Sequence, residues 1–451
     1  MTLKEKLSAI SAERLATTLV TLYDENPALQ KQLDMLFAGL EDKPTKLKRI
    51  LKKEISSLRR DPRFIDYYQS RSFAGEIDAI RLRIFEDLKS KSPADAFELM
   101  EGFLNTHEVT LNRADDSNGD VGEVFREACR DFGEIAKVTS FDALQLAEKI
   151  FNKFMNNDYG IYDDIIKDFK ESLKNEGLDF LKEKLLLSDR EKKGYAIQQG
   201  LQIIADCRGD VDDYIKARFL KGEIHGRGCL DVAERLINHW RIKEALEWIE
   251  KVNLKENALW RGECHDLRIK ALELEGSYDS AQGERLLWFE ESLSVKTYEQ
   301  ILKNGDEKFK ESFRQDAIKK AFNFSAPHTA VRFLMESQEI EALREIIRLK
   351  HDQLYGRDYS LLRPVASLLE EVDPIAASLI YRRMGHPVLE EAKSKYYKYA
   401  AKDLVRCEVL SHGIKDWGNI ETHEAYFKEF QESHKRKISF WREYESLKDQ
   451  K

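Results

Sequence analysis

Apolar residues recur at steps of three and four along almost the whole of this 451-residue chain. Ile77, Ile80, Ile84 and Leu88 form one such series. This spacing places apolar side chains on one face of an α-helix, whereas a half-buried strand alternates at every second residue. Only 8 prolines and 22 glycines interrupt the pattern. The chain is therefore predicted to be all-α, with too many helices for a simple bundle.

Two pairs of alanines recur at a nearly constant distance. A polar turn precedes each alanine and bulky apolar residues follow it. Ala245 and Ala281 lie 36 positions apart, and Ala342 and Ala376 lie 34 apart. A period near 34 residues is long enough for two helices and is typical of stacked helical hairpins. An α-solenoid is therefore predicted.

The stretch ALELEGSYDSA resembles the turn of a tetratricopeptide repeat. Gly276, Tyr278 and Ala281 fall where that repeat carries its glycine, its tyrosine and its small packing residue. Gly276 is expected to end one helix in the left-handed conformation, and Ala281 is expected to let the next helix approach closely. A helix–turn–helix that arose by chance is the alternative.

Most of the chain, from about residue 55 to residue 442, resembles a bacterial family known only as a domain of unknown function. The stretches RFIDYYQSRSFAGEIDAI and HGRGCLDVAERLI carry the resemblance, and the ending THEAYFKEFQESHKRKISFW is its most specific part. The resemblance implies a helical-repeat fold whose C-terminal half is similar to the helical region of SWIM zinc-finger proteins. The Cys-x-Cys and Cys-x-His motifs of the SWIM module do not occur here, so the resemblance implies no zinc site.

The composition narrows the class of protein. The net charge of −8 and a pI of about 5.9 argue against a surface that binds nucleic acid throughout. No stretch approaches the ~20 apolar residues of a membrane span, so no membrane partner is expected. The first residues contain no apolar signal core, and five cysteines at irregular spacing are typical of reduced thiols. A cytoplasmic protein is predicted.

Motifs for catalysis, cofactors or metals do not occur in the sequence. It contains no Gly-x-Ser-x-Gly, no Gly-Lys-Ser/Thr loop and no His-Glu-x-x-His. The nearest approaches to metal ligands are His225 with Cys229, and Cys264 beside His265. Two glycines flank Arg227 before an amphipathic helix, so an anion contact is possible there, with a plain exposed turn as the alternative. We expect no enzyme activity, no cofactor and no metal.

One acidic turn, RADDSNGDVGEVF at residues 113–125, looks like a ligand site. Its glycines do not fit the register of a calcium loop, and its acidic residues would repel a phosphate. We instead predict a helix start, with Asp120 as N-cap and Glu123 as the second half of a capping box. Gly119 is expected to supply the turn, and Asp115 and Asp116 to accept hydrogen bonds from nearby backbone N–H groups. The turn is interpreted as a hinge, with a partner contact as the alternative.

Residues 43–63 form a basic segment with nine lysines or arginines against two acidic residues. Lys48, Lys52, Arg59 and Arg60 lie on it beside an apolar stripe. A cationic helix followed by tyrosines is typical of a surface that tracks a phosphate backbone and stacks bases. The alternative is a packing helix whose basic face meets an acidic face of the same protein.

A second segment, residues 393–406, mixes Lys393, Lys395 and Lys398 with tyrosines in the same way. Both segments are candidates for partner or nucleic-acid contact. The tyrosines near residues 67 and 396 are expected to be core residues, because aromatic side chains at helical spacing usually are.

The sequence predicts two regions and a closing helix. Residues 1–140 are expected to form an N-terminal helical region, and residues 141–451 a tetratricopeptide-like repeat domain. One aromatic helix, from about residue 421 to residue 447, is expected to cap the last open face of the array, with dimerisation or a partner anchor as alternatives.

Stacked helical pairs usually hold another protein or a peptide. We therefore predict a non-enzymatic protein–protein interaction scaffold or adaptor. The alternative is a nucleic-acid-associated component of a defence or regulatory system, which would bind through the two basic segments. The oligomeric state and the partner stay open.

Overall fold

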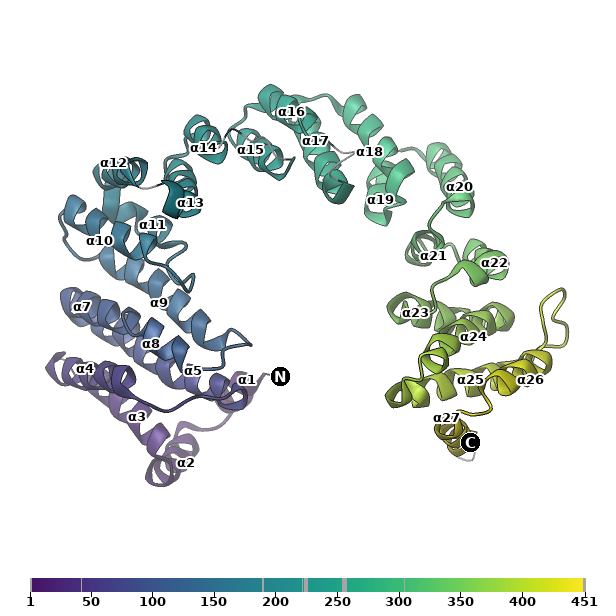
Figure 1. Cartoon of the computed structure of the whole chain (residues 1–451), viewed down its shortest axis with the longest axis horizontal. Coiled ribbons are helices and arrows are strands. Elements are labelled where there is room, and N and C mark those ends of the chain that lie inside the picture. The colour runs from purple at the N-terminus through teal and green to yellow at the C-terminus, as the bar shows by residue number, and fades with distance from the viewer. Residues whose placement is uncertain are drawn as a thin grey trace. The chain divides into compact units, whose positions relative to one another are not determined.

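The computed structural model describes residues 2–41, 43–188, 190–220, 222, 226–253, 258–303 and 305–448. Nearly all of them lie in helices or in the short turns between helices (Figure 1). These ranges contain no β-strand, and their one isolated bridge joins Ile65 to Ala114. The prediction of an all-α fold is confirmed. No helix in the described ranges is both long and apolar enough to cross a lipid bilayer.

The chain forms two compact units, Met1–Gly228 and Cys229–Lys451. In the first unit, helices that follow one another in the sequence mostly lie side by side (Figure 1). Its elements are α1 Leu3–Ser8, α2 Ala12–Glu25, α3 Pro27–Leu40, α4 Thr45–Arg60, α5 Tyr67–Leu82, the π-helix η1 Arg83–Leu88, α6 Lys89–Lys91, α7 Pro93–Leu104, α8 His107–Asn112, α9 Asp120–Ala136, α10 Ala143–Met155, α11 Ile165–Asp168, α12 Lys170–Leu187, α13 Arg190–Arg208 and α14 Val211–Arg218.

One continuous hydrophobic core runs through the first unit, from Met35 to Ala217. It crosses residue 140 without a break, because Phe132 of α9 stacks edge-on against Phe169, which follows α11, at 5.0 Å between ring centroids. The structure therefore divides the chain at Gly228 rather than at the boundary that the sequence suggested.

The second unit is a series of helical pairs (Figure 1). Pairing is closest between α24 and α25, followed by α23 with α24, α25 with α27, and α17 with α18. The bounds are α15 Gly226–Asn238, which contains the division between the units, α16 Ile242–Glu250, the 3₁₀ turn η2 Ala258–Trp260, α17 Arg261–Glu275, α18 Tyr278–Ser292, α19 Val295–Lys303, α20 Glu307–Asn323, α21 Pro327–Glu336, α22 Ile340–Lys350, η3 His351–Gln353, α23 Tyr359–Leu369, α24 Pro374–Glu390, η4 Ser394–Tyr396, α25 Tyr397–Ser411, α26 His423–His434 and α27 Ile438–Lys448.

The four recurring alanines lie where the helices of each pair meet. Ala245, Ala281 and Ala376 have no exposed surface, and Ala342 is 8% exposed. A methyl side chain at these places lets neighbouring backbones come close, so the recurrence in the sequence is a recurrence of helix packing. The predicted α-solenoid of helical hairpins is confirmed as the fold class.

One turn geometry joins the helices of several pairs. Gly276 ends α17 with φ of 85°, and the next helix begins two residues later. The N–H of Ser277 donates to the carbonyl of Leu272, and that of Gly276 donates to Glu273, which is the Schellman pattern. Trp240 and Gln338 hold the same left-handed place before α16 and α22, with φ of 60° and 61°. The turn therefore recurs where the sequence has no glycine.

The C-terminal end differs from its prediction in one respect. Two helices, α26 and α27, replace the single helix expected over residues 421–447, because the chain turns at Lys435–Lys437. Phe430, Phe440 and Tyr444 are at most 2% exposed and form a core cluster with residues of α24 and α25. The aromatic side chains thus cover the last helices of the array, in agreement with the arrangement expected of a cap.

Candidate functional site

The acidic turn before α9 is a helix start, but its capping residue is Asp116. The carboxylate of Asp116 accepts hydrogen bonds from the N–H groups of Val121 and Gly122, both at 2.8 Å. The residue before the helix is Gly119, with φ of 77°, so the predicted turn glycine is confirmed. The predicted bond from a backbone N–H to Asp115 is also present, from Ser117 at 3.3 Å.

The capping box predicted for Asp120 and Glu123 is wrong. Asp120 is the first residue of α9 rather than its cap. The carboxylate of Glu123 turns away from the helix start and pairs with Arg126 at 2.8 Å and Arg130 at 3.0 Å. The chain before the helix is long enough for an aspartate four residues further back to reach its N–H groups, which the local pattern did not reveal. The turn lies within the first unit, so it is not a hinge between the compact units.

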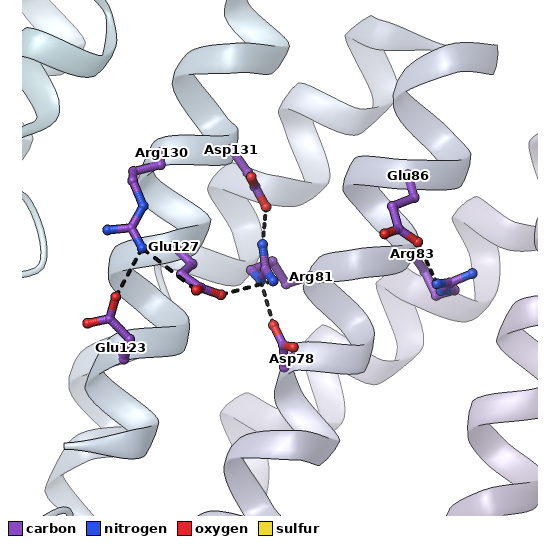
Figure 2. A network of polar contacts seen from close by, with 8 residues as sticks. All are labelled: Asp78, Arg81, Arg83, Glu86, Glu123, Glu127, Arg130 and Asp131. Atoms are coloured by element: carbon purple, nitrogen blue, oxygen red, sulfur yellow. Dashed lines mark hydrogen bonds and ion pairs between the residues drawn. The ribbon is translucent and has the colours of Figure 1, made fainter. Parts of the chain in front are cut away.

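A buried arginine joins α5 to α9 (Figure 2). Arg81 contacts Asp78 of its own helix at 2.5 Å, and Glu127 and Asp131 of α9 at 3.0 and 2.5 Å. Burial raises the pKa of Asp131 in spite of the neighbouring Arg81. Figure 2 shows the guanidinium enclosed by these three carboxylates, so the network is saturated and fixes the two helices rather than offering a free charge.

The basic segment 43–63 is helix α4 and its flanks. Its apolar stripe is buried, as expected. Lys48 pairs with Asp95 at 2.6 Å and Glu98 at 3.1 Å, both on α7, and Lys52 lies 3.8 Å from Glu98. Two of the four contact residues proposed on this segment therefore meet acidic residues of the same unit. Arg59 and Arg60, at the end of the helix, are exposed.

The tyrosines after this helix are on the surface, which corrects the expectation of core residues. Tyr68 is 91% exposed and Tyr67 is 49% exposed, and Phe64 beside them is 67% exposed. The face of α5 that carries them is exposed in the described part of the chain, while the opposite face, with Phe73 and Ile77, is buried. Helical spacing fixes which residues share a face, but not which face another helix covers.

The second basic segment forms the wall of a cavity of about 440 Å³ in the second unit. Lys393 contributes to it, together with Tyr359, Tyr396 and Tyr399. Tyr396 and Tyr399 are 41% and 47% exposed, so the expectation of core residues is wrong here too, although Tyr397 between them is buried. This tyrosine cavity presents aromatic faces that are already ordered by the repeat.

The remaining lysines of that segment flank the tyrosines. The ammonium groups of Lys395 and Lys398 lie 4.8 and 5.2 Å from the ring centres of Tyr396 and Tyr399. Lys393 pairs with Glu391 at 2.7 Å. Lys393 thus lines the cavity, whereas Lys395 and Lys398 lie beside the tyrosine rings without being part of its lining.

A buried ion pair supports the tyrosine cavity. Arg363 donates two hydrogen bonds to Asp403, at 2.9 and 3.0 Å, and the aspartate is 2% exposed. Burial raises the pKa of Asp403 to about 6, although the guanidinium opposes that shift. The pair links α23 to α25, the helices that carry Tyr359 and Tyr399.

Four predicted residues remain: Arg227, Gly276, Tyr278 and Ala281. Arg227 is exposed in the first turn of α15, and residues 223–225, which include His225, lie outside the described ranges. Gly276 and Ala281 have the turn and packing roles expected of them. Tyr278 is 69% exposed, so it does not pack into the hairpin.

The sequence reasoning missed a repeated ion pair in the second unit. Arg314 of α20 holds Glu339 through Nε and Nη2, at 2.5 and 2.7 Å, and Arg348 of α22 holds Asp373 in the same way, at 2.7 Å for both bonds. In each case the carboxylate belongs to the residue just before the next-but-one helix, 25 positions after the arginine. The sequence does contain a signal for this repeated pair. An arginine recurs 34 positions after Arg314, and an acidic residue recurs 34 positions after Glu339.

Possible metal ligands and cysteine thiols were also compared over the described part of the chain. No group of three His, Cys, Asp or Glu side chains in it is placed to hold a metal ion. Burial raises the pKa of four cysteines, including Cys264 to about 11 and Cys407 to about 12. Those thiols therefore stay protonated and unreactive near neutral pH.

Comparison with solved structures includes a circular tandem repeat protein with novel repeat topology and enhanced subunit contact surfaces. It is 16% identical and the match covers 97% of this chain and 99% of that one, but the TM-score is 0.15, so the likeness carries no argument. No curated protein matches the chain. The model of one family of unknown function, DUF6880, matches residues 2–193 and 187–443. The resemblance to a family of unknown function is thereby confirmed, whereas bacterial origin and likeness to SWIM proteins stay predictions. The chain belongs to the DUF6880 family.

Proposed function

We propose that this protein is a non-enzymatic scaffold that holds a peptide segment of another protein, in the cytoplasm and without a cofactor. The observation that carries the proposal is the tyrosine cavity of the second unit. Tyr359, Tyr396 and Tyr399 line about 440 Å³ there, in a stack of helical hairpins. Tyrosines contribute large contact areas at low entropic cost and are enriched at the centres of protein interfaces.

The charges around the cavity favour a peptide over a small apolar ligand. Arg357 and Lys393 both pair with Glu391 at the rim, and these two cations are partly exposed. Such a rim can exchange its own ion pair for charges on a partner while the rings bury an apolar side chain. The high pKa of the buried thiols supports the non-enzymatic part of the proposal.

Site-specific photo-crosslinking tests the proposal. A benzoylphenylalanine at position 396 should crosslink a distinct partner in native cells. The same group at position 278, where the natural tyrosine is more exposed than Tyr396 but lies on α18, should not. The double variant Tyr396→Ala/Tyr399→Ala should lose that partner, and Tyr278→Ala should keep it. An identical set of crosslinked proteins from both positions would count against the cavity as the binding site.

Nucleic-acid binding is a second candidate, favoured by the exposed rings at the start of α5. Tyr67 and Tyr68 lie next to Arg71 in sequence, with Arg59 and Arg60 nearby on the exposed end of α4. Bases stack on exposed tyrosines, and each such contact contributes about 1–3 kcal/mol. The internal pairing of Lys48 and Lys52 leaves fewer cations for a phosphate backbone than the sequence suggested.

Anisotropy of labelled single-stranded RNA and DNA across a salt series tests this candidate. Binding should weaken steeply with salt, and charge reversal at Arg59 and Arg60 should lower the affinity more than reversal at Lys48 and Lys52. Replacement of Tyr67 and Tyr68 by alanine should weaken it further. If these alanines leave the affinity unchanged, the rings do not stack on bases and the candidate fails.

A further inference from the structure

Arg382, in the middle of α24, is a buried cation that forms no ion pair with the carboxylates of the described residues. Its side chain is 6% exposed, and its Nη1 donates to the carbonyl oxygen of Glu421 at 3.0 Å. Its Nε and Nη2 have no hydrogen-bond partner. The guanidinium lies against Trp417 and Tyr426, with 4.9 and 4.5 Å from Cζ to the ring centres. Since arginine stays protonated in proteins, these rings stabilise a buried charge that no carboxylate in the described ranges contacts directly.

Comparison with the two preceding repeats shows which partner Arg382 lacks. Arg314, Arg348 and Arg382 follow one another at intervals of 34 residues. The first two grip a carboxylate just before the next-but-one helix, as described above. In the third case the residue before that helix, α26, is Thr422, and the residue 25 positions after Arg382 is Cys407, so neither place holds a carboxylate. The arginine fork is kept while its partner is lost.

Space for a ligand exists beside this arginine. A cavity of about 590 Å³ is lined by Arg382, Arg383, His351, His386 and Tyr426, among others. The Nδ1 of His351 has no partner either. The carboxylates of Asp352, Glu421 and Glu429 also line the cavity. These three residues are exposed, whereas Arg382 is buried.

We propose that this cavity receives one carboxylate group of a bound peptide, which completes the ion pair with Arg382. The inference rests on the proposed scaffold function and names the chemistry of the partner. A single carboxylate fits because the same fork holds one in each of the two preceding repeats. A phosphate monoester, with close to two negative charges, would meet more repulsion from the three exposed acidic side chains at the cavity.

Ligand-observed NMR on the intact chain tests the inference with short peptides. The probes are Ac-Ala-Ala-Glu-Ala-Ala-NH₂, its glutamine and phosphoserine counterparts, and Ac-Ala-Ala-Ala-Ala-Ala with a free C-terminal carboxylate. At least one carboxylate peptide should bind about tenfold more tightly than the glutamine peptide. The two carboxylate probes distinguish an acidic side chain from a chain terminus. Tighter binding of the phosphoserine peptide than of both carboxylate probes would overturn the inference.

Variants locate the binding. Arg382→Gln should abolish the preference for a carboxylate, and Arg382→Lys, which keeps the charge but loses the planar fork, should weaken it. Arg314→Gln is the matched control, because it removes the equivalent arginine of an earlier repeat and does not line the cavity. Unchanged preference in Arg382→Gln would refute the site. That failure is separate from a failure of the scaffold proposal, which depends on crosslinking at position 396.

Discussion

Gln338 and Gly276 hold the same left-handed place in two helical turns, and the difference between them has a measurable cost. An ideal Cβ at Gly276 meets nothing within 4 Å, so the penalty for a side chain there is conformational. Gly276→Ala should destabilise the protein by about 1 kcal/mol, and Gln338→Gly should stabilise it by a similar amount. Denaturant unfolding of both variants checks the prediction. Changes of the same sign would show that the backbone conformation is not the cause.

Asp168, at the end of α11, should make stability depend on pH. Burial, helped by the charge of Asp164, raises its pKa to about 6 from the usual 3.8. The folded protein therefore holds a proton that the unfolded chain has released, and stability falls as pH rises through about 4 to 6. Asp168→Asn should be more stable than the wild type at pH 7, and the difference should shrink towards pH 4. Thermal unfolding at both pH values measures it.

Single residues also show how far the sequence could be interpreted. Gly276 was predictable because glycine favours the left-handed region, whereas Trp240 and Gln338 were not, because neither residue type marks such a turn. The exposure of Tyr68 and Tyr396 was missed for another reason. Periodicity assigns residues to a face of a helix, and only tertiary packing decides whether that face is covered.

At the scale of an element, the start of α9 depends on a side chain outside the helix. Asp116→Ala removes the acceptor of two backbone N–H groups and should cost about 1 kcal/mol. Glu123→Ala, which removes only exposed ion pairs, should cost less than about 0.5 kcal/mol. Chemical denaturation of both variants compares them. A larger loss of stability in Glu123→Ala than in Asp116→Ala would instead support the capping box predicted from the sequence.

The repeated arginines should differ in their effect on stability. Arg314→Gln leaves the carboxylate of Glu339, which is 8% exposed, without its partner and should cost about 1–3 kcal/mol. Arg382→Gln abandons no carboxylate and should change stability by less than about 1 kcal/mol. Unfolding curves for both variants check this contrast. Equal losses would mean that Arg382 has a structural partner of comparable strength.

At the scale of the whole molecule, acid should act first on the C-terminal helices. Burial, reinforced by the charge of Arg382, lowers the pKa of His423 to about 4, and burial also lowers those of His386 and His434. The unfolded chain takes up these protons first, so stability is lost as pH falls from about 6.5 towards 4. Hydrogen exchange at pH 7.5 and pH 5 should show α26 and α27 losing protection before α21 and α22. His423→Gln should reduce that loss; equal loss in the variant would assign it to other groups.

The sequence was sufficient for the fold class and for the hairpin period, because both follow from local spacing. The sequence was not sufficient to predict where the chain divides into its two compact units. Hydrophobic residues continue at helical spacing across residue 140 and across residue 228 alike, and only the contacts between distant side chains distinguish the two places. The cavities were missed for the same reason, since each is lined by residues from helices that are separate in the sequence.

The pairing of Arg348 with Asp373 makes the array extensible. A segment from Ile340 to Asp373 begins with the first residue of α22 and ends with the acid that precedes α24, so it carries both halves of one ion pair. A tandem duplication of these 34 residues would present each arginine to an acid in the original register. An insertion one residue shorter would rotate the next helix by about 100° and separate them. We therefore expect that one helical pair with its ion pair can be added to the second unit by duplicating this 34-residue segment.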